Sequence, residues 1–185
     1  MRIVITGVPG TGKSVLAPRL AEKLGAKLID INALVKTKKL YTSKKGGEYV
    51  ADLKKLQRAL ARPPRNAVIE GHLTCEIKIP ADLVIVFRTN PALLTTRLRR
   101  RGYTEAKIAQ NIEAEELDYC TQLALKHYPA GRVYEIETSK SPGTNLREID
   151  AIISGKGAAF RAGWVNWSKQ LLKKLQKAQI APKTL

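Results

Sequence analysis

The 185-residue chain carries 33 Lys and Arg side chains against 16 Asp and Glu, which gives a formal net charge of +17. Its length suits one α/β domain with a substantial core and excludes two large domains. The charge favours a polyanionic partner, such as RNA, a nucleotide or an acidic protein surface, over a basic surface that only keeps copies apart. No apolar run approaches the roughly 18 to 20 residues that span a bilayer, so no membrane partner is expected.

The first residues and the two cysteines indicate a compartment. The opening MRIVITG has neither the long apolar stretch nor the cleavage site of a signal peptide. Cys75 and Cys120 lie far apart in the sequence without metal-type spacing, which is typical of reduced structural thiols. We therefore expect a cytoplasmic protein, or a nuclear one if the organism is eukaryotic.

Taken in chain order, short apolar and β-branched runs predict strands at residues 2–6, 27–31, 67–70, 83–88 and 132–137. Helices are predicted over residues 13–24, 49–62, 91–101, 104–127 and 145–153, each placed by apolar spacing and by Pro, Gly or Thr at its ends. Residues 36–47 are basic and poor in apolar side chains, so we expect them to be mobile. Strands that alternate with helices indicate a parallel sheet covered on both faces.

The segment between the first strand and the first helix fits the phosphate-binding pattern G-x-x-x-x-G-K-[ST]. Glycines let the backbone wrap around a phosphate, and the following helix adds its positive N-terminal dipole. Lys13 is expected to reach the β- and γ-phosphates, and the Ser14 hydroxyl to bind Mg²⁺. The predicted ATP-binding residues here are Gly7, Pro9, Gly10, Thr11, Gly12, Lys13, Ser14 and Val15.

Two further groups of side chains are candidates for catalysis. Glu70 ends a predicted strand and His72 follows it, although a carboxylate at a strand end is usually solvated and a single histidine is usually packed or capping. Arg97 and Arg101 are spaced i, i+4, so they share one helix face that can point over a nucleotide, while Arg99 and Arg100 face elsewhere. The alternative is a solvated basic helix.

The C-terminal segment after Gly155 is basic and is predicted to be helical over residues 158–179. Its apolar residues recur at steps of three and four, which predicts one apolar helix face: Phe160, Trp164, Trp167, Leu171, Leu172 and Leu175. Because exposing two tryptophans is costly, we expect this face to dock onto the domain and leave the lysines for phosphates. On that view, deleting residues 156–185 leaves ATP turnover largely intact but weakens RNA binding. The alternative is a purely structural brace.

Four segments carry a family resemblance: GVPGTGKS, VIEGH, VFRTNP and RLRRRGYTEAKIAQNIEAE. Together they resemble the adenylate kinase-like proteins of archaea and eukaryotic nuclei, known in animals as the adenylate kinase isoenzyme six type. The resemblance covers about residues 1–153. It implies a three-layer α/β P-loop kinase fold with a parallel five-stranded sheet. It also implies an acceptor-binding insertion at about 32–62, a short lid at about 101–111, and a C-terminal extension at 154–185 outside the family's core.

The resemblance also implies roles for residues. Lys13 and Ser14 match phosphate and metal residues, and Glu70 and His72 match an acidic-x-histidine motif linked to metal positioning and water activation. Arg97 would flank the adenine and Arg101 the transferring phosphates, with Ser139 and Lys140 in the loop beside the adenine. The implied metal ligands are Ser14 and Glu70. Two positions depart from the family pattern: Val15 stands where a second hydroxyl is common, and Glu70 replaces an aspartate.

The expected activity is transfer of a phosphoryl group from ATP to AMP, with Mg²⁺ as cofactor and an accompanying ATPase activity. Family members are implicated in maturation of the small ribosomal subunit, which makes rRNA and a platform ribosomal protein expected partners. One alternative is an assembly factor that uses ATP hydrolysis as a switch. Another is a kinase for a different small substrate, since residues 32–62 contain no diagnostic acceptor motif.

Overall fold

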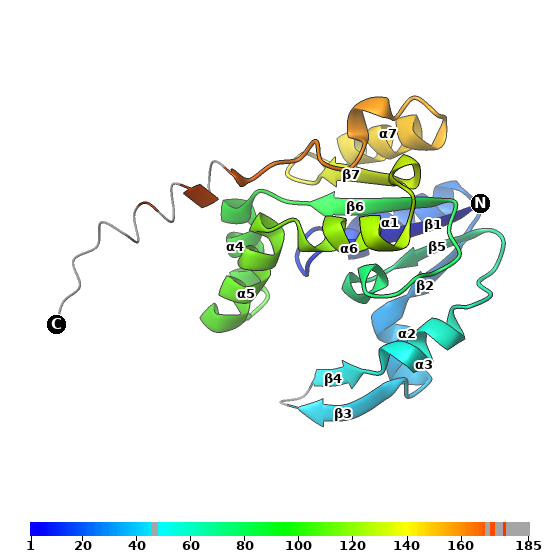
Figure 1. Cartoon of the computed structure of the whole chain (residues 1–185), viewed down its shortest axis with the longest axis horizontal. Coiled ribbons are helices and arrows are strands. Elements are labelled where there is room, and N and C mark those ends of the chain that lie inside the picture. The colour runs from blue at the N-terminus through cyan, green and yellow to red at the C-terminus, as the bar shows by residue number, and fades with distance from the viewer. Residues whose placement is uncertain (46–47, 169–170, 173–175, 177–185) are drawn as a thin grey trace.

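The computed structural model describes residues 1–45, 48–168, 171, 172 and 176. Its centre is a parallel sheet of five strands in the order β2-β5-β1-β6-β7 (Figure 1). Near-continuous apolar runs form these strands, as is typical of a sheet covered on both faces. Their bounds are β1 Arg2–Thr6, β2 Lys27–Asp30, β5 Ala67–Glu70, β6 Leu83–Arg88 and β7 Val133–Glu137.

Alternate residues of β1 enter different layers of the core. Ile3 and Ile5 pack with apolar side chains of α1 (Lys13–Lys23) and α7 (Pro142–Ile153). Val4 packs in a second cluster with residues of α4 (Pro91–Arg100), α5 (Glu105–Glu116) and α6 (Tyr119–His127). The sheet therefore has a helical layer on each face, which confirms the predicted three-layer α/β P-loop kinase fold.

The region between β2 and β5 differs from the prediction. After α2 (Ile31–Thr37), β3 (Tyr41–Lys45) and β4 (Glu48–Ala51) pair as an antiparallel hairpin, and α3 spans only Leu53–Ala59. The expected helix from residue 49 is wrong at its start, since it begins only at Leu53, and the described part of 36–47, which we expected to be mobile, contains the end of α2 and the strand β3. Asp52 ends the hairpin and caps α3 by accepting from the Lys55 amide at 3.0 Å. Figure 1 shows the hairpin projecting away from the central sheet.

The predicted long helix over 104–127 is also two helices. Thr104 caps α5 as expected, but Asp118 adopts a left-handed conformation with φ 55° and breaks the chain direction before α6 begins. The Asp118 carboxylate accepts from Arg88, an arginine at the end of β6. This ion pair accounts for the break. Cys75 and Cys120 are both buried free thiols.

The predicted helix over residues 158–179 is wrong for its first part, whereas the described residues Ser168, Leu171, Leu172 and Gln176 are helical. Residues Ala158–Phe160 form a short 3₁₀ turn, and residues 161–167 are not helical. Trp164 and Trp167 hydrogen-bond instead to the kinase domain, so docking onto protein is confirmed although the helical geometry was wrong. Leu175 and the lysines 169, 173, 174 and 177 lie outside the described residues. None of the helices described by the structure is both long and apolar enough to span a membrane.

Candidate active site

The loop between β1 and α1 has the backbone of a phosphate cradle. Gly7, Gly10 and Gly12 have φ angles of 133°, 92° and 92°, which side chains rarely adopt. A Cβ on Gly7 would lie 2.4 Å from the Phe87 carbonyl oxygen, and one on Gly10 would lie 2.8 Å from Leu94. Thr11 is buried and its hydroxyl donates to the Val8 carbonyl at 2.9 Å, which holds the loop from inside. The loop therefore requires glycine for its own shape.

The side chain of Lys13 lies folded against this loop. Its Nζ donates to the carbonyl oxygens of Gly7 at 2.7 Å and Val8 at 2.9 Å. Burial lowers the pKa of Lys13 to about 8, against the opposing effect of Glu70 and the cysteine thiols. Nζ also donates to the Thr11 hydroxyl at 3.5 Å. A buried ammonium held by such neutral acceptors is well placed to exchange them for the oxygens of a phosphate.

Acidic and hydroxyl side chains surround a small central cavity of about 190 Å³. Glu70 is buried at the end of β5, directly beside Asp30 at the end of β2, and the exposed Ser14 opens α1. Burial, and then the Asp30 charge, raise the pKa of Glu70, while Lys13 acts in the opposite direction. Asp30 was missed in the sequence, although its place at the end of a neighbouring parallel strand was a usable signal.

These oxygen donors fit a magnesium ion. Mg²⁺ is usually bound by one or two carboxylates together with substrate phosphates rather than by a complete protein cage. No cluster of three or more His, Cys, Asp or Glu side chains able to hold a metal occurs in the described ranges. Ser14 and Glu70 line the cavity together, as the prediction required.

His72 lies between the central cavity and a larger one. It begins a 3₁₀ turn, His72–Cys75, directly after Gly71, and it lines both cavities. A Cβ on Gly71 would lie 2.7 Å from Ile31, so a larger residue there would push this turn away from the start of α2. The close packing at Gly71 therefore sets the position of His72.

A cavity of about 360 Å³ opens on the other side of the glycine loop, beneath α4. Arg97 is half-buried there and donates to the carbonyl oxygen of Thr138 at 2.9 Å. Burial, and then the neighbouring Arg101 charge, lower the pKa of Arg97. Arg97 and Arg101 thus place two guanidinium groups close together beside the glycine loop. A bound anion would reduce the repulsion between their charges.

The prediction for the other two arginines was half right. Arg99 is paired with Glu105 at 2.9 Å and lines none of the cavities of the nucleotide site. Arg100 does line the 360 Å³ cavity, contrary to our expectation. The reason is geometric, because residues spaced i and i+3 share a helix face as much as residues spaced i and i+4.

The loop after β7 contributes unevenly to this cavity. Lys140 lines it and forms an ion pair with Glu148 at 2.6 Å, and Val15 lines it from α1. Ser139 does not line it, and its hydroxyl instead accepts from the Asn90 amide at 3.3 Å on the other side of the loop. The implied contact of the Ser139 side chain with the nucleotide is therefore not supported.

A larger cavity, of about 750 Å³, lies between the β3–β4 hairpin and α5. Its walls combine aromatic and apolar side chains with amides and charged groups: Pro9, Asn32, Val35, Tyr49, Val50, Ala51, Leu53, His72, Leu73, Glu76, Tyr103, Lys107, Gln110 and Asn111. Most of these were missed as individual residues, since the hairpin itself was not predicted. The Gly46-Gly47 pair between two β-prone runs was a signal for it.

The three cavities are adjacent and share lining residues, and we refer to them together as the channel. Gly10, Gly12 and Arg101 line both the 360 Å³ cavity and the central one. Pro9, Asn32, His72 and Tyr103 line both the central cavity and the 750 Å³ one. The phosphate cradle thus lies between two chambers, each large enough for a small molecule.

Comparison with known proteins agrees with this arrangement. A family model described as an AAA domain matches residues 3–118. Two archaeal proteins, each named "Putative adenylate kinase", match nearly the whole chain. The one from Methanocaldococcus jannaschii is 37% identical and covers 92% of this chain and 94% of its own. The one from Archaeoglobus fulgidus is 38% identical, with the same coverage. The chain belongs to the adenylate kinase-like P-loop family.

Solved structures show the same fold at lower identity. Shikimate kinase from Acinetobacter baumannii has a TM-score of 0.62 at 19% identity and covers 84% of this chain and 94% of its own. Deoxyadenosine kinase from M. mycoides has a TM-score of 0.55 at 14% identity and covers 84% and 100%. These likenesses place the adenylate kinase-like chain in the P-loop kinase fold and say nothing further about its acceptor.

Proposed function

We propose that this protein transfers the γ-phosphoryl group of ATP to AMP and forms two molecules of ADP. The observation that carries the proposal is the row of adjacent cavities, with a phosphate cradle between a 360 Å³ chamber and a 750 Å³ chamber. A transferase needs a donor and an acceptor held on opposite sides of the transferred group. The names of the archaeal relatives support adenosine nucleotides as the pair.

Positive charge at the centre of the channel supports an acceptor that itself carries a phosphate. Lys13 and Arg101 line the central cavity, and Lys107 lines the acceptor chamber beside it. Phosphoryl transfer depends mainly on positioning and on neutralising the oxygens of the transferred group. In this scheme Lys13 and Arg101 hold those oxygens, while Arg97 holds the donor nucleotide against the Thr138 loop.

Mg²⁺ held by Ser14 and Glu70 would neutralise phosphate charge when bound. The protein's own contribution at that point is to keep Glu70 buried and to keep His72 at the opening between the central and acceptor cavities. In the absence of an acceptor, the same placement of His72 suits assistance to an attacking water, which would give a slower ATPase activity.

Steady-state kinetics with a panel of acceptors tests the proposal. Phosphoryl transfer from ATP is measured to AMP, to other nucleoside monophosphates and to uncharged alcohols, and we expect AMP to be the best acceptor. Tyr49→Ala should raise the KM for AMP and leave the KM for ATP unchanged, because Tyr49 lines only the acceptor chamber. Equal transfer to an uncharged alcohol would instead favour a kinase for another small substrate.

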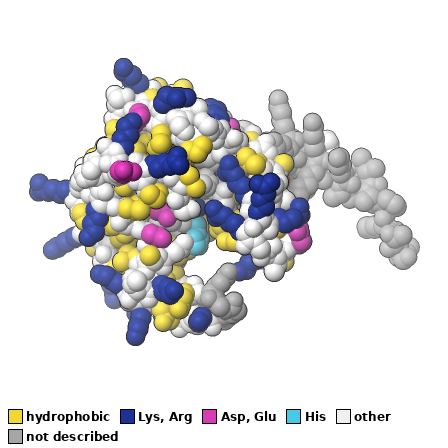
Figure 2. Space-filling view, turned by 180° about the vertical axis from the view of Figure 1, so that it is seen from behind, with side chains coloured by type: hydrophobic (Ala, Val, Ile, Leu, Met, Phe, Trp, Pro, Cys, Tyr) yellow, Lys and Arg dark blue, Asp and Glu magenta, His cyan; other side chains and the backbone are white. Residues whose placement is uncertain are grey.

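A second candidate function rests on the charge of +17. Lys and Arg side chains are spread over most of the face seen in Figure 2, with few acidic ones among them. This distribution favours an ATPase-driven assembly factor that acts in small ribosomal subunit maturation, in the cytoplasm or nucleus, on rRNA or a platform ribosomal protein. Binding to small-subunit rRNA at several salt concentrations tests it, since several phosphate contacts give a steep decline of affinity with salt.

A further inference from the structure

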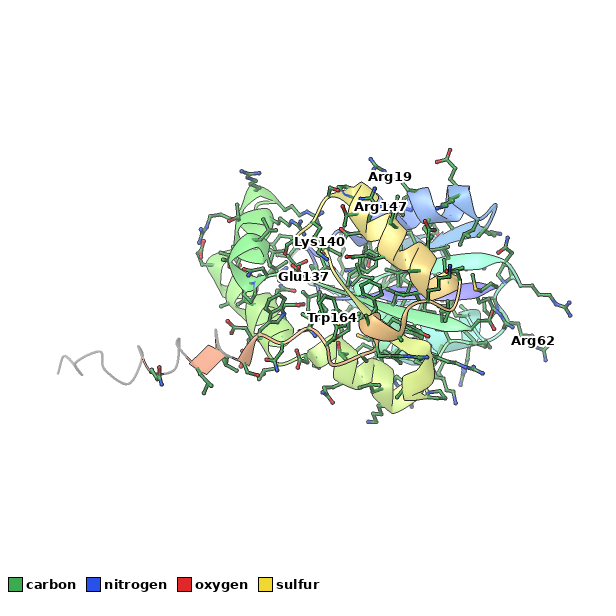
Figure 3. All side chains as sticks on the ribbon, turned by 90° about the horizontal axis from the view of Figure 1, so that it is seen from above. Arg19, Arg62, Glu137, Lys140, Arg147 and Trp164 are labelled. Atoms are coloured by element: carbon green, nitrogen blue, oxygen red, sulfur yellow. The ribbon has the colours of Figure 1, made fainter. Side chains whose placement is uncertain are left out.

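The segment that follows α7 runs alongside β7 toward the end of the sheet where the nucleotide site lies (Figures 1 and 3). We call residues 163–167 the C-terminal strap. Val165 and Trp167 are buried within it, whereas Trp164, labelled in Figure 3, is 41% exposed. Residues 163–167 are not themselves helical, although the Trp167 carbonyl oxygen accepts from the Leu171 amide at 3.0 Å, so the position of the strap depends mainly on what it contacts.

The first contact is with Glu135, a fully buried carboxylate on β7. One oxygen, Oε2, accepts from the strap amides of Gly163 at 2.9 Å and Val165 at 3.1 Å. The other, Oε1, accepts from Arg88 at 2.6 Å and from the Thr121 hydroxyl at 2.7 Å. The strap therefore supplies half of the hydrogen bonds that a buried charge requires.

The second contact is between Trp167 and Glu115, a buried residue of α5. The indole Nε1 donates to Glu115 Oε1 at 2.9 Å. The same oxygen accepts from Arg88 Nε at 2.8 Å and from the backbone amide of Thr89 at 3.1 Å. Trp167 thus holds the carboxylate that fixes the start of the loop between β6 and α4.

From Thr89 the hydrogen bonds continue into the nucleotide site. The Thr89 hydroxyl accepts from Arg97 Nη1 at 3.4 Å and lies 2.6 Å from the Thr138 hydroxyl. The Thr138 hydroxyl in turn lies 2.8 Å from the carbonyl oxygen of Thr11 in the glycine loop. Arg97 also donates to the Thr138 carbonyl oxygen at 2.9 Å. The path from Trp167 to the phosphate cradle is unbroken.

We propose that Trp167 is a positioning residue of the donor site, which acts through Glu115 and Thr89 on Arg97 and the Thr138 loop. The inference rests on nucleotide binding at the glycine loop, and it is independent of the identity of the acceptor. This proposal contradicts the expectation that residues 156–185 are dispensable for ATP turnover. Their loss would remove hydrogen-bond donors from the buried carboxylates of Glu115 and Glu135.

A matched pair of variants tests the proposed role of Trp167. Trp167→Phe keeps an aromatic ring and removes the indole donor to Glu115. Trp164→Phe removes an indole donor from the same strap, but that donor bonds the backbone carbonyl of Glu135, which lies off the path to Arg97. We expect Trp167→Phe to weaken binding of a non-hydrolysable ATP analogue about 3- to 10-fold, the effect of one hydrogen bond, and Trp164→Phe to leave it unchanged.

Reciprocity provides a second measurement with the Trp164→Phe protein, in which Trp167 is the remaining tryptophan. If strap docking favours nucleotide binding, nucleotide binding must favour docking. The ATP analogue should therefore reduce acrylamide quenching of Trp167 fluorescence, although Trp167 lines none of the cavities of the nucleotide site.

The outcomes separate this inference from the proposed function. Wild-type protein that binds no ATP analogue contradicts nucleotide binding itself. Wild-type protein that binds it, together with equal dissociation constants for the two folded variants, overturns the role of Trp167. Quenching that is unaffected by the analogue overturns it as well, and this result does not depend on whether Trp167→Phe folds.

Discussion

The Lys13 ammonium donates to the Gly7 carbonyl oxygen at 2.7 Å, across the loop that both residues help to form. From this position the lysine can turn to a bound phosphate. Its burial also means that the charged form is held at a cost to folding. These two consequences lead to separate predictions.

Lys13→Ala should abolish ATP turnover and leave the fold intact. The substitution removes the positive charge that neutralises the transferred phosphate. It also removes a buried ammonium, and the depressed pKa of that ammonium indicates a free-energy cost of folding on the order of 3 kcal/mol. We expect a thermal unfolding temperature no lower than that of the wild type, because removal of this penalty opposes the loss of the hydrogen bonds to Gly7 and Val8. Near-normal turnover by the folded variant would contradict the assignment of the glycine loop as a phosphate-binding site.

The rate should depend on pH through Lys13. Because its pKa in the free protein is about 8, kcat/KM for ATP should decline above that pH as the ammonium is lost. The free energy of unfolding should change with pH in the opposite direction to kcat/KM. The unfolded chain holds this proton up to its ordinary pKa of 10.5, so stability rises between about pH 8 and 10.5. A kcat/KM that is flat to pH 10 would contradict this assignment.

His72→Ala should lower ATP hydrolysis more than ATP binding. His72 lies at the opening between the central and acceptor cavities rather than in the donor chamber. Assistance by a general acid or base is typically worth about 10²- to 10⁴-fold in rate. Single-turnover rates and binding of the ATP analogue separate the two quantities. A variant that loses affinity but hydrolyses each bound ATP at the normal rate would make His72 structural.

Alanine substitutions of the four arginines at the end of α4 should lower the activity by different amounts. Arg97→Ala and Arg101→Ala are expected to lower kcat/KM for ATP about 10²-fold, because both line the nucleotide channel. Arg100→Ala should have a smaller effect of about 2- to 5-fold, since the exposed Arg100 lines only the 360 Å³ cavity whereas Arg101 also lines the central one. Arg99→Ala is the matched control, because Arg99 is paired with Glu105. If Arg99→Ala costs as much as Arg97→Ala, the assigned helix face is wrong.

The central sheet and the cradle were predictable because their signals are local. The GVPGTGKS segment specifies its own backbone, and short apolar runs specify buried parallel strands. The acceptor chamber was not predictable to the same degree, since Tyr49, Tyr103 and Asn111 come from separate elements and meet only in the fold. The same holds for the C-terminal strap, where helical spacing predicted a helix. The buried carboxylates of Glu115 and Glu135 bond residues 163–167 in an irregular conformation instead.

The most direct test of the proposed function is the stoichiometry of ADP formation from ATP, measured with and without AMP. Adenylate kinase activity predicts that AMP accelerates ADP formation, with two ADP formed for each ATP consumed and no inorganic phosphate released from that reaction. One ADP and one inorganic phosphate for each ATP, at a rate that AMP does not change, would contradict phosphotransfer to AMP and leave only ATP hydrolysis.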